Sequence, residues 1–352
     1  MYPPRPIASR RAGLRSLVLA FLASVLPLAH ADTAPPTPPA SAMAAYAKAH
    51  AAVVGLRSTV SDEAPSAQSL GRQRAGSGVL IAKDGLILTI GYLMLEADAI
   101  QIVTQDNRTL PARAVAYDQA TGFGLVRTLL PIDGLEPVGL GPLGDLRNGE
   151  PLMAVSGAQP DGADGDVSMV VLVDKRPFSG YWEYHIEAAA FTSPPIGNHS
   201  GAGLFNQRGE LVGVGSLLVS DALGPGRRLP GNMFVPVDLL RPILDEMQRT
   251  GSSKTSHRPW LGVSSAEQSG RVQIIRVSKG SPAQQAGLAP GDLVLAVDGA
   301  KVATLEAFYK KLWDRADPEG EVNLTVLQGA EIKTMRIRMV DRMRTMHKPA
   351  GV

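Results

Sequence analysis

Most of the chain between residues 52 and 237 alternates apolar with polar positions or forms short β-branched runs. One group of such segments comprises residues 52–60, 78–91, 99–105, 109–118 and 123–130, and a second comprises residues 151–159, 167–175, 184–191, 203–219 and 232–237. Short alternating runs bounded by Gly, Asp or Asn are typical of strands. A looser stretch, residues 131–148, separates the groups. The pattern therefore predicts two packed β-barrels.

Turn and helix signals complete this region. Lys83, Asp84 and Gly85 lie between two apolar runs, as the turn of a hairpin does, and residues 206–209 give a second hairpin signal. The alanine-rich residues 42–51 predict a short helix. A second helix, ended by Gly251, is predicted from apolar residues at helical spacing: Leu239, Leu240, Ile243, Leu244 and Met247.

A separate unit follows a polar linker at residues 251–258. Residues 259–342 contain one helical segment, residues 305–315, among short strand-like runs, and residues 343–352 form a tail. The fold class predicted for the whole chain is mainly β, with a double β-barrel followed by a smaller α+β domain.

The first 31 residues have the pattern of a secretory signal peptide. Arginines from Arg5 to Arg15 precede an apolar run of about a dozen residues, and Ala29-His30-Ala31 has the small residues that a signal peptidase recognises. The run is shorter than the roughly 20 residues needed to span a bilayer. We expect cleavage near Ala31 and export, to the periplasm, of a chain without a membrane span. Ser9-Arg10-Arg11 leaves the Sec and twin-arginine routes both open.

Composition narrows the function further. The signal segment holds four arginines and no acid, so its removal changes the net charge from +2 to −2 and argues against a nucleic-acid partner. Residues 32–44 are proline-rich and predict an extended tether. The chain has no cysteine, which excludes disulfides, a thiol nucleophile and Cys-ligated zinc. Its histidines lack the close spacing of a local metal site, and we expect no metal and no cofactor.

Residues 281–302 resemble the core of the PDZ domains found in exported proteases. The preceding residues 258–263 resemble the loop with which PDZ domains hold a peptide C-terminus. This resemblance implies that peptide or protein C-termini are the partners, with carboxylate capture by the loop Trp260, Leu261, Gly262 and Val263. The helix wall of the groove would include Leu305, Phe308 and Leu312, although Leu261 and Phe308 are equally explained as core residues.

Three segments of the double barrel resemble the catalytic segments of the HtrA/DegP family of trypsin-like serine proteases. Residues 76–100 correspond to the segment of the catalytic histidine, residues 118–127 to that of the aspartate, and residues 197–214 to that of the nucleophilic serine. The resemblance extends over residues 45–342, so it implies a trypsin-like domain at residues 45–250 and a PDZ domain at residues 259–342.

The match fails at the catalytic positions themselves. Ser200 occupies the nucleophile position, but Tyr92 stands at the histidine position and Gly122 at the aspartate position. Asn198 replaces a glycine of the segment that, with Ser200, would supply the oxyanion hole. A serine hydroxyl needs a base, and tyrosine with a reference pKa of about 10 is a poor one. The sequence therefore predicts a pseudoprotease that acts as an adaptor, regulator or chaperone-like factor in envelope protein quality control.

Two other functions stay open at this point. An active endopeptidase would need Ser200 with an unconventional base, such as the adjacent His199 or His185. A metal-binding function would need two or more of His50, His185 and His199 to converge with carboxylates. The aromatic cluster Tyr181, Trp182 and Tyr184 is expected to be a partly buried patch. A homotrimer, or association with an active HtrA protease, is compatible with the resemblance.

Overall fold

The computed structural model describes residues 40–158 and 165–346. The predicted signal peptide, most of the tether and the end of the tail lie outside the described residues. Helix α1 (Ala40–Ala51) confirms the helix predicted from the alanine-rich segment. Within the described ranges, none of the helices is both long and apolar enough to cross a bilayer.

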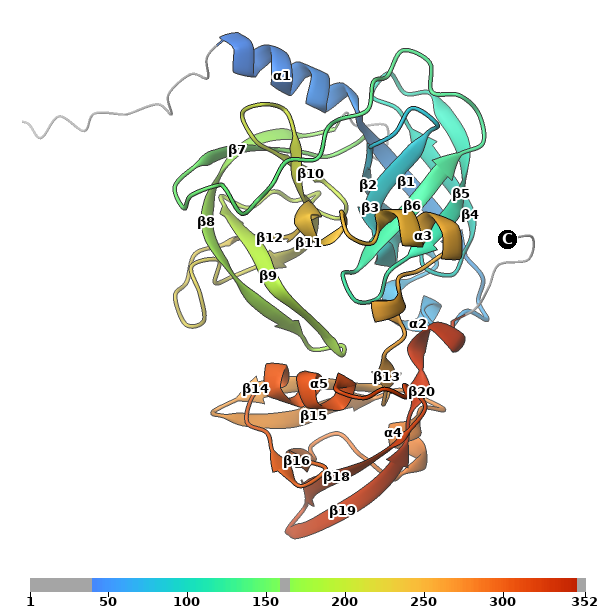
Figure 1. Cartoon of the computed structure of the whole chain (residues 1–352), viewed down its shortest axis with the longest axis vertical. Helices are drawn as coiled ribbons and strands as arrows, with labels where there is room; N and C mark the ends of the chain where they lie inside the picture. The colour runs from blue at the N-terminus through green and yellow to red at the C-terminus, as the bar shows by residue number, and fades with distance from the viewer. Residues whose placement is uncertain (1–39, 159–164, 347–352) are drawn as a thin grey trace, which may run out of the picture. The chain divides into compact units, whose positions relative to one another are not determined.

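The first group of strands closes into a barrel (Figure 1) with the order β1-β2-β3-β6-β5-β4. The strands are β1 (Val53–Val60), β2 (Gln73–Leu80), β3 (Leu86–Ile90), β4 (Ala97–Val103), β5 (Thr109–Tyr117) and β6 (Phe123–Thr128). The helix α2 (Ala67–Leu70) and the 3-10 turn η1 (Gly91–Leu93) lie between strands. Leu56, Leu88 and Phe123 are fully buried in the core of this barrel, as inward positions of alternating strands should be.

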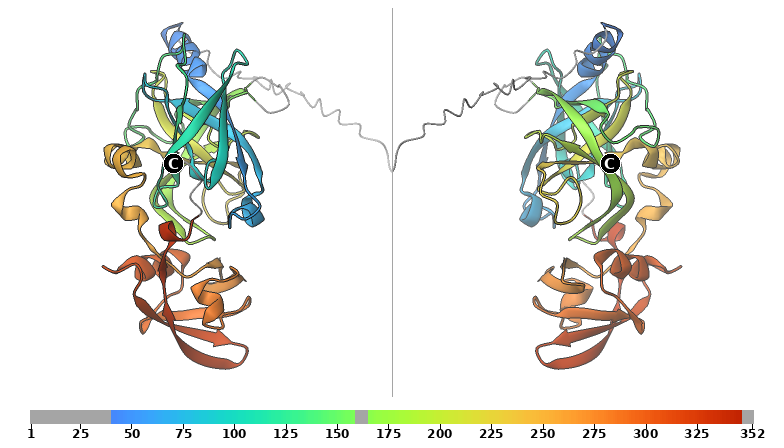
Figure 2. Two further views of the ribbon diagram at one scale, coloured as in Figure 1. Left: turned by 90° about the vertical axis from the view of Figure 1, so that its right-hand side faces the viewer. Right: turned by 90° about the vertical axis from the view of Figure 1, so that its left-hand side faces the viewer.

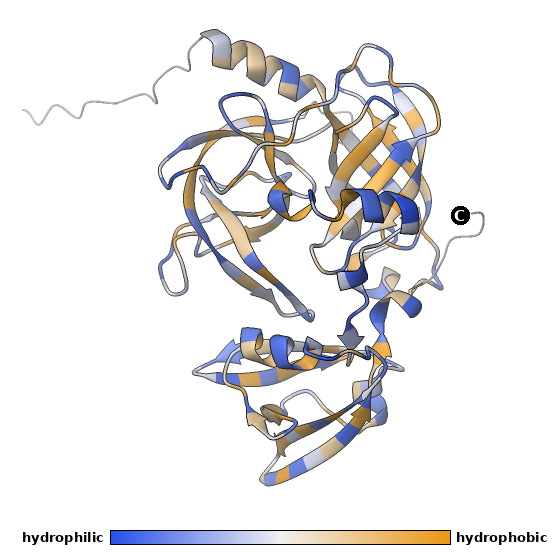
Figure 3. Cartoon of the chain, viewed as in Figure 1, coloured by the Kyte–Doolittle hydropathy of each residue, from blue (hydrophilic) through white to orange (hydrophobic). Residues whose placement is uncertain are grey.

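The second group closes in the same way, with the order β10-β11-β12-β9-β8-β7. Its strands are β7 (Pro151–Val155), β8 (Val167–Gly180), β9 (Tyr184–Ser193), β10 (Gly203–Phe205), β11 (Leu211–Val219) and β12 (Gly231–Pro236). Both views of Figure 2 show the strands curving round, and Figure 3 shows apolar residues concentrated on them. The predicted double barrel is confirmed. The strand β8 extends five residues beyond its predicted end at residue 175 and forms a long hairpin with β9.

The helix predicted after Val237 is shorter than its apolar spacing suggested. The structure has a 3-10 turn η2 (Val237–Leu239), and α3 (Leu244–Thr250) begins only afterwards. Pro242 explains the difference, because the residue before a proline is disfavoured in the helical region. Gly251 ends α3 in the left-handed conformation, as predicted.

The C-terminal unit is a PDZ-like α+β domain with its own apolar core. Its main sheet has the order β14-β15-β16-β18-β19, with β17 paired to β16 and a separate β13-β20 pair. The strands are β13 (Pro259–Trp260), β14 (Val263–Gln268), β15 (Arg271–Val277), β16 (Leu293–Val297), β17 (Ala300–Lys301), β18 (Glu321–Gln328), β19 (Glu331–Arg338) and β20 (Val340–Asp341). The helices are η3 (Lys254–Ser256), α4 (Pro282–Gln285), α5 (Leu305–Trp313) and η4 (Arg342–Arg344). One edge of the main sheet is β14.

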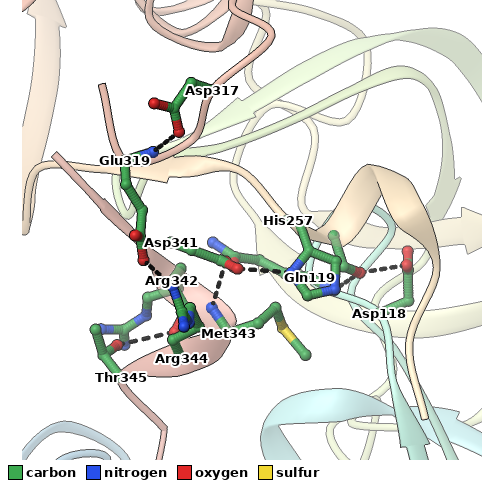
Figure 4. Close-up of polar contacts among 11 residues, drawn as sticks. Asp118, Gln119, His257, Asp317, Glu319, Asp341, Arg342, Met343, Arg344 and Thr345 are labelled. Atoms are coloured by element: carbon green, nitrogen blue, oxygen red, sulfur yellow. Dashed lines mark hydrogen bonds and ion pairs between the residues drawn. The ribbon is translucent and has the colours of Figure 1, made fainter. Parts of the chain in front are cut away.

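The predicted polar linker is in fact partly buried. Ser253 and Ser256 are almost inaccessible, and both hydroxyls donate to the carboxylate of Asp118. On the other side, His257 Nδ1 lies 2.6 Å from Asp341 Oδ2 (Figure 4). Hydrogen bonds therefore fix the linker to the first barrel and to the C-terminal strand pair, which composition alone did not indicate.

Candidate active site and peptide groove

Tyr92, at the position predicted for the catalytic histidine, contacts Ser200, at the position predicted for the nucleophile. Tyr92 lies in η1 of the first barrel, and Ser200 lies in the loop before β10 of the second. The Tyr92 hydroxyl is 2.8 Å from Ser200 Oγ and 2.9 Å from the carbonyl oxygen of Ser216. The structure therefore brings together two predicted positions that are 108 residues apart in the sequence.

Contacts to the backbone hold the Tyr92 turn in place. The guanidinium of Arg74, a buried residue of β2, donates to the carbonyl oxygen of Tyr92 at 2.9 Å. The Gly91 N–H donates to Gly122 O at 2.7 Å, which joins this turn to the one at the aspartate position. A Cβ atom at Gly91 would lie 2.3 Å from a ring carbon of Tyr117, so only glycine permits this approach.

The environment of Tyr92 makes it a poor base. Burial raises the pKa of the Tyr92 phenol to about 12, although its hydrogen bond with Ser200 acts in the opposite direction. A phenol with this pKa stays protonated at neutral pH. It shares a hydrogen bond with the serine hydroxyl but does not remove its proton, which nucleophilic attack requires.

The aspartate position lies at the end of a tight turn. Gly122 has a φ of +81°, and its N–H donates to Asp118 O at 2.7 Å. The Tyr184 hydroxyl donates to the carbonyl oxygen of Thr121 at 2.6 Å. A Cβ atom at Gly122 would meet Tyr184 Oη at 3.4 Å, an ordinary van der Waals distance. Space therefore exists for a side chain at Gly122, and the left-handed backbone is the main restriction.

The loop of Ser200 depends on glycine. Gly201 has a φ of +76°, and a Cβ atom there would lie 2.0 Å from the carbonyl oxygen of Ser77. The Asn198 side chain points to the second barrel, where its Nδ2 donates to Asp166 at 3.2 Å. The loop is therefore tightly packed at Gly201, directly after Ser200, whereas Asn198 is exposed.

Neither histidine considered as a substitute base is bonded to Ser200 in this structure. His199 Nδ1 lies 3.1 Å from the carbonyl oxygen of Gly197, and His185 Nδ1 lies 2.9 Å from Ser179 Oγ. Burial lowers the pKa of both imidazoles. Among the described residues, the only side chain hydrogen-bonded to Ser200 Oγ is that of Tyr92.

His185 belongs to a cluster with two glutamates. Its possible ligand atom and those of Glu187 and Glu306 all lie within 4.8 Å of one another. The Lys310 ammonium contacts both carboxylates, at 2.8 Å from Glu187 and 2.7 Å from Glu306. The lysine thus supplies the positive charge that a metal ion would supply. The metal hypothesis required a second histidine, and neither His50 nor His199 is a member of this cluster.

The residues predicted for carboxylate capture surround a carboxylate that belongs to the chain itself. Leu261, Gly262 and Val263 donate their consecutive N–H groups to the side chain of Glu183, at 3.1, 2.7 and 2.9 Å. Gly262 has a φ of +85°, which turns the loop toward this side chain. Trp260 lies beside the loop and packs under the Arg342 guanidinium, 4.2 Å from the ring centroid.

The predicted helix wall is mainly core. Leu305, Phe308 and Leu312 are all buried and belong to the apolar cluster of the C-terminal domain. The neighbouring Tyr309, which sequence reasoning did not select, contacts the second barrel, as Lys310 does: its hydroxyl donates to Gly180 O at 2.9 Å.

Glu183 also escaped the sequence analysis, which considered only the aromatic residues around it. The available signal was an acid placed within the run Tyr181-Trp182-Glu183-Tyr184. A glutamate that is 3% exposed among aromatic side chains requires hydrogen-bond donors, and the N–H groups that satisfy it come from residues about 80 positions away. Local patterns do not reveal such a contact.

Two closed barrels with Ser200 at their boundary form the architecture of trypsin-like serine peptidases. A small PDZ-like domain follows them. The family model of the trypsin-like peptidase domain matches residues 76–214, and that of the PDZ domain matches residues 259–339. The chain therefore contains a trypsin-like peptidase domain and a PDZ domain, and it is similar to HtrA- and DegP-like serine proteases.

Two relatives illustrate this similarity. A periplasmic DegP-like serine endoprotease of Hahella chejuensis is 28% identical over 271 residues, which cover 73% of this chain and 55% of that protein. Serine protease PepD of Mycobacterium tuberculosis is 29% identical over 278 residues, covering 73% of this chain and 58% of PepD. The chain thus spans little more than half the length of these relatives.

Solved structures show the same fold. The HtrA-type protease AlgW with a decapeptide superposes with a TM-score of 0.53 at 20% identity, covering 86% of this chain and 98% of AlgW. The serine endoprotease from Yersinia pestis gives a TM-score of 0.51 at 21% identity, covering 87% of this chain and 99% of that one.

Proposed function

We propose that this chain is an exported HtrA-like pseudoprotease that binds peptide or protein C-termini through its PDZ domain. It would act as an adaptor, regulator or chaperone-like factor. The observation that carries the first half of the proposal is the Tyr92 hydroxyl, 2.8 Å from Ser200 Oγ with its pKa raised to about 12 by burial. The base position is filled by a group that keeps its proton.

The other triad position supports the same conclusion. An aspartate in a serine protease orients the imidazole and stabilises its charged form. A tyrosine that stays neutral needs no such partner, and Gly122 provides none. The two departures from the HtrA/DegP segments are therefore chemically consistent with each other.

Incubation of the purified protein with unfolded casein tests the absence of hydrolysis, with Ser200→Ala as the matched control. We expect the same low background from both proteins. Cleavage by the native chain that disappears in Ser200→Ala would overturn the proposal.

The second candidate is an active serine endopeptidase of the HtrA/DegP type. Its support is that the relatives of this chain are named serine endoproteases and that Ser200 is retained in a glycine-dependent turn. This function would require a base other than the Tyr92 phenol. The casein experiment separates the two candidates directly.

The peptide-binding half of the proposal rests on the nest of three N–H groups at residues 261–263, since such a nest suits a carboxylate. An array of peptides with free or amidated C-termini tests it. We expect free C-termini to bind more strongly, whereas equal binding to both forms would contradict carboxylate capture by the Trp260–Val263 loop.

We further propose that the protein acts in the periplasm, where the names of its DegP-like relatives place those proteins. Assembly as a homotrimer or with an active HtrA protease is part of the same hypothesis. Light scattering of the purified chain, alone and mixed with such a protease, measures both.

A further inference from the structure

The turn between β8 and β9 contributes a buried carboxylate to the PDZ domain. Glu183 Oε1 accepts from the N–H groups of Gly262 (2.7 Å) and Val263 (2.9 Å), and Oε2 accepts from Leu261 (3.1 Å). Glu183 is only 3% exposed, and its own backbone has a φ of +56°. All three consecutive N–H groups of the loop are therefore used by one side chain.

The same turn also pairs with the edge strand of the domain. The Ser265 N–H donates to the carbonyl oxygen of Tyr181 at 2.8 Å. Val263 and Ser265 are alternate residues of β14, and their partners Glu183 and Tyr181 are likewise two residues apart. A peptide that adds to a sheet edge makes backbone bonds at this same two-residue spacing.

The helix α5 contacts the turn from the opposite side. The Tyr309 hydroxyl donates to Gly180 O at 2.9 Å and lies 3.3 Å from the Glu183 N–H, which donates to it. The turn is therefore bonded to α5 at Gly180 and Glu183, and to β14 through the Tyr181 carbonyl oxygen and the Glu183 side chain. It lies between the two walls that a PDZ ligand contacts.

We propose that the β8–β9 turn is an internal ligand of the PDZ groove, in which the Glu183 side chain takes the place of a peptide C-terminal carboxylate. This inference rests on the proposed function, because it assumes that the groove binds C-termini. A peptide carboxylate and Glu183 compete for the same N–H groups, so an external peptide binds only after residues 181–183 withdraw.

Tyr184 directly follows Glu183, and its hydroxyl donates to the carbonyl oxygen of Thr121 in the first barrel. The turn therefore lies between contacts to the first barrel and contacts to the PDZ loop. The energetic requirement is that the external ligand interacts with the open form better than with the closed one.

Fluorescence polarisation with a labelled peptide tests the competition, using the free-carboxylate peptide selected on the array and its amidated form. The variant Glu183→Ala removes the internal ligand. Glu331→Gln is the matched control, because it changes an exposed glutamate of β19, at the sheet edge opposite β14. We expect Glu183→Ala to bind the free-carboxylate peptide at least tenfold more tightly than the native chain, and Glu331→Gln to bind like the native chain.

Tyr309→Phe provides a second variant that keeps the loop and Glu183 intact. It removes the hydroxyl that bonds both ends of the turn, so we expect an intermediate gain in peptide affinity. Circular dichroism confirms that each variant is folded. Hydrogen exchange supplies an independent readout: the amides of residues 261–263 should be protected in the native chain, exposed in Glu183→Ala, and protected again when the peptide is added.

The outcomes distinguish this inference from the proposed function. If native chain and Glu183→Ala bind the free-carboxylate peptide equally well, the groove binds C-termini but Glu183 is not a competitor. If neither binds any peptide with a free carboxylate and the 261–263 amides of Glu183→Ala stay exposed on addition, both the proposed function and the internal-ligand inference are wrong. Unchanged protection of these amides in Glu183→Ala also contradicts the inference.

Discussion

At the scale of single residues, Tyr92 links the two barrels. Its hydroxyl contacts Ser200 Oγ and the carbonyl oxygen of Ser216, both in the second barrel. Arg74 donates to the carbonyl oxygen of Tyr92 and holds the same turn in the first barrel. Tyr92 therefore has a structural function at the boundary of the barrels.

Removal of this hydroxyl should affect stability rather than chemistry. In Tyr92→Phe, the partners Ser200 and Ser216 lose their hydrogen bond, and we expect unfolding to become easier by about 1 kcal/mol. Thermal denaturation measures the change, with Tyr181→Phe as a control because Tyr181 is largely exposed. A change in casein cleavage, instead of in the melting temperature, would assign Tyr92 to catalysis.

The complementary experiment introduces an imidazole at position 92 and a carboxylate at position 122. Tyr92→His alone supplies a base without an orienting carboxylate, whereas Tyr92→His with Gly122→Asp supplies both. Aspartate tolerates a positive φ better than most residues, and space for a Cβ exists at Gly122. We expect the double variant to exceed the native chain in casein hydrolysis by roughly 10²–10⁴-fold, the usual contribution of a positioned base.

The control for that gain is Ser200→Ala in the same double-variant background, which should return hydrolysis to the background level. A double variant that folds but stays inactive would show that a further feature, such as the Asn198 loop, also prevents catalysis.

At the scale of elements, the strands were predictable because each alternates apolar and polar residues locally. Two features were not. Pro242 shortens the helix expected after Val237, and the linker proved to be buried because Ser253 and Ser256 donate to Asp118, more than 130 residues away. Local periodicity carries no information on partners at that distance, so the polar composition of the linker did not indicate its hydrogen bonds to Asp118.

Asp118 should therefore be important for anchoring the linker. Its carboxylate accepts from Thr121 N at 2.8 Å and Thr121 Oγ1 at 2.7 Å, as well as from both serines. In Asp118→Asn, one acceptor oxygen becomes a donor, and we expect a loss of about 1–3 kcal/mol in unfolding free energy. Hydrogen exchange should rise locally at residues 253–256.

The exposed Asp62 offers a comparison, because its ion pair with Arg72 lies at the surface. Asp62→Asn should change stability by less than about 0.5 kcal/mol. Equal effects of the two substitutions would mean that the buried network around Asp118 adds nothing beyond an ordinary surface contact.

At the scale of the whole molecule, the sequence indicated the order of the domains but not the contacts between them. The resemblance grouped Tyr92, Gly122 and Ser200, and the structure places the Tyr92 hydroxyl beside Ser200 and joins Gly91 to Gly122. Glu183 has no counterpart in those patterns, and its partners at residues 261–263 become visible only in three dimensions. The contact joins the second barrel to the PDZ loop, and the proposed peptide binding would therefore depend on both domains.

This contact should make peptide binding depend on pH. Burial raises the pKa of Glu183 from 4.5 to about 7, although the N–H groups of Val263, Leu261 and Gly262 and the charge of Arg342 oppose the shift. A raised pKa means that the docked turn binds a proton more readily than the free turn. Docking is therefore strongest below about pH 4.5 and weakens as the pH rises to about 7.

Peptide affinity should follow the opposite course, since the peptide carboxylate, with a reference pKa of about 3.5, is ionised throughout this range. We expect the affinity of the native chain for the free-carboxylate peptide to increase between pH 5 and 7 and then to level off. Fluorescence polarisation across this range measures it. Of the other groups near the turn, the Tyr309 phenol stays protonated, and burial lowers the pKa of the His185 imidazole from 6.5, so a variant at Glu183 is needed to separate the two titrations.

Glu183→Gln decides whether Glu183 is the titrating group, because glutamine occupies the same volume and does not ionise. Its peptide affinity should be nearly independent of pH between 5 and 7, whereas Glu331→Gln, at the opposite sheet edge, should keep the profile of the native chain. If Glu183→Gln retains the rise, another group controls the groove. If the native chain shows no rise at all, the turn does not release a proton when it leaves the PDZ loop.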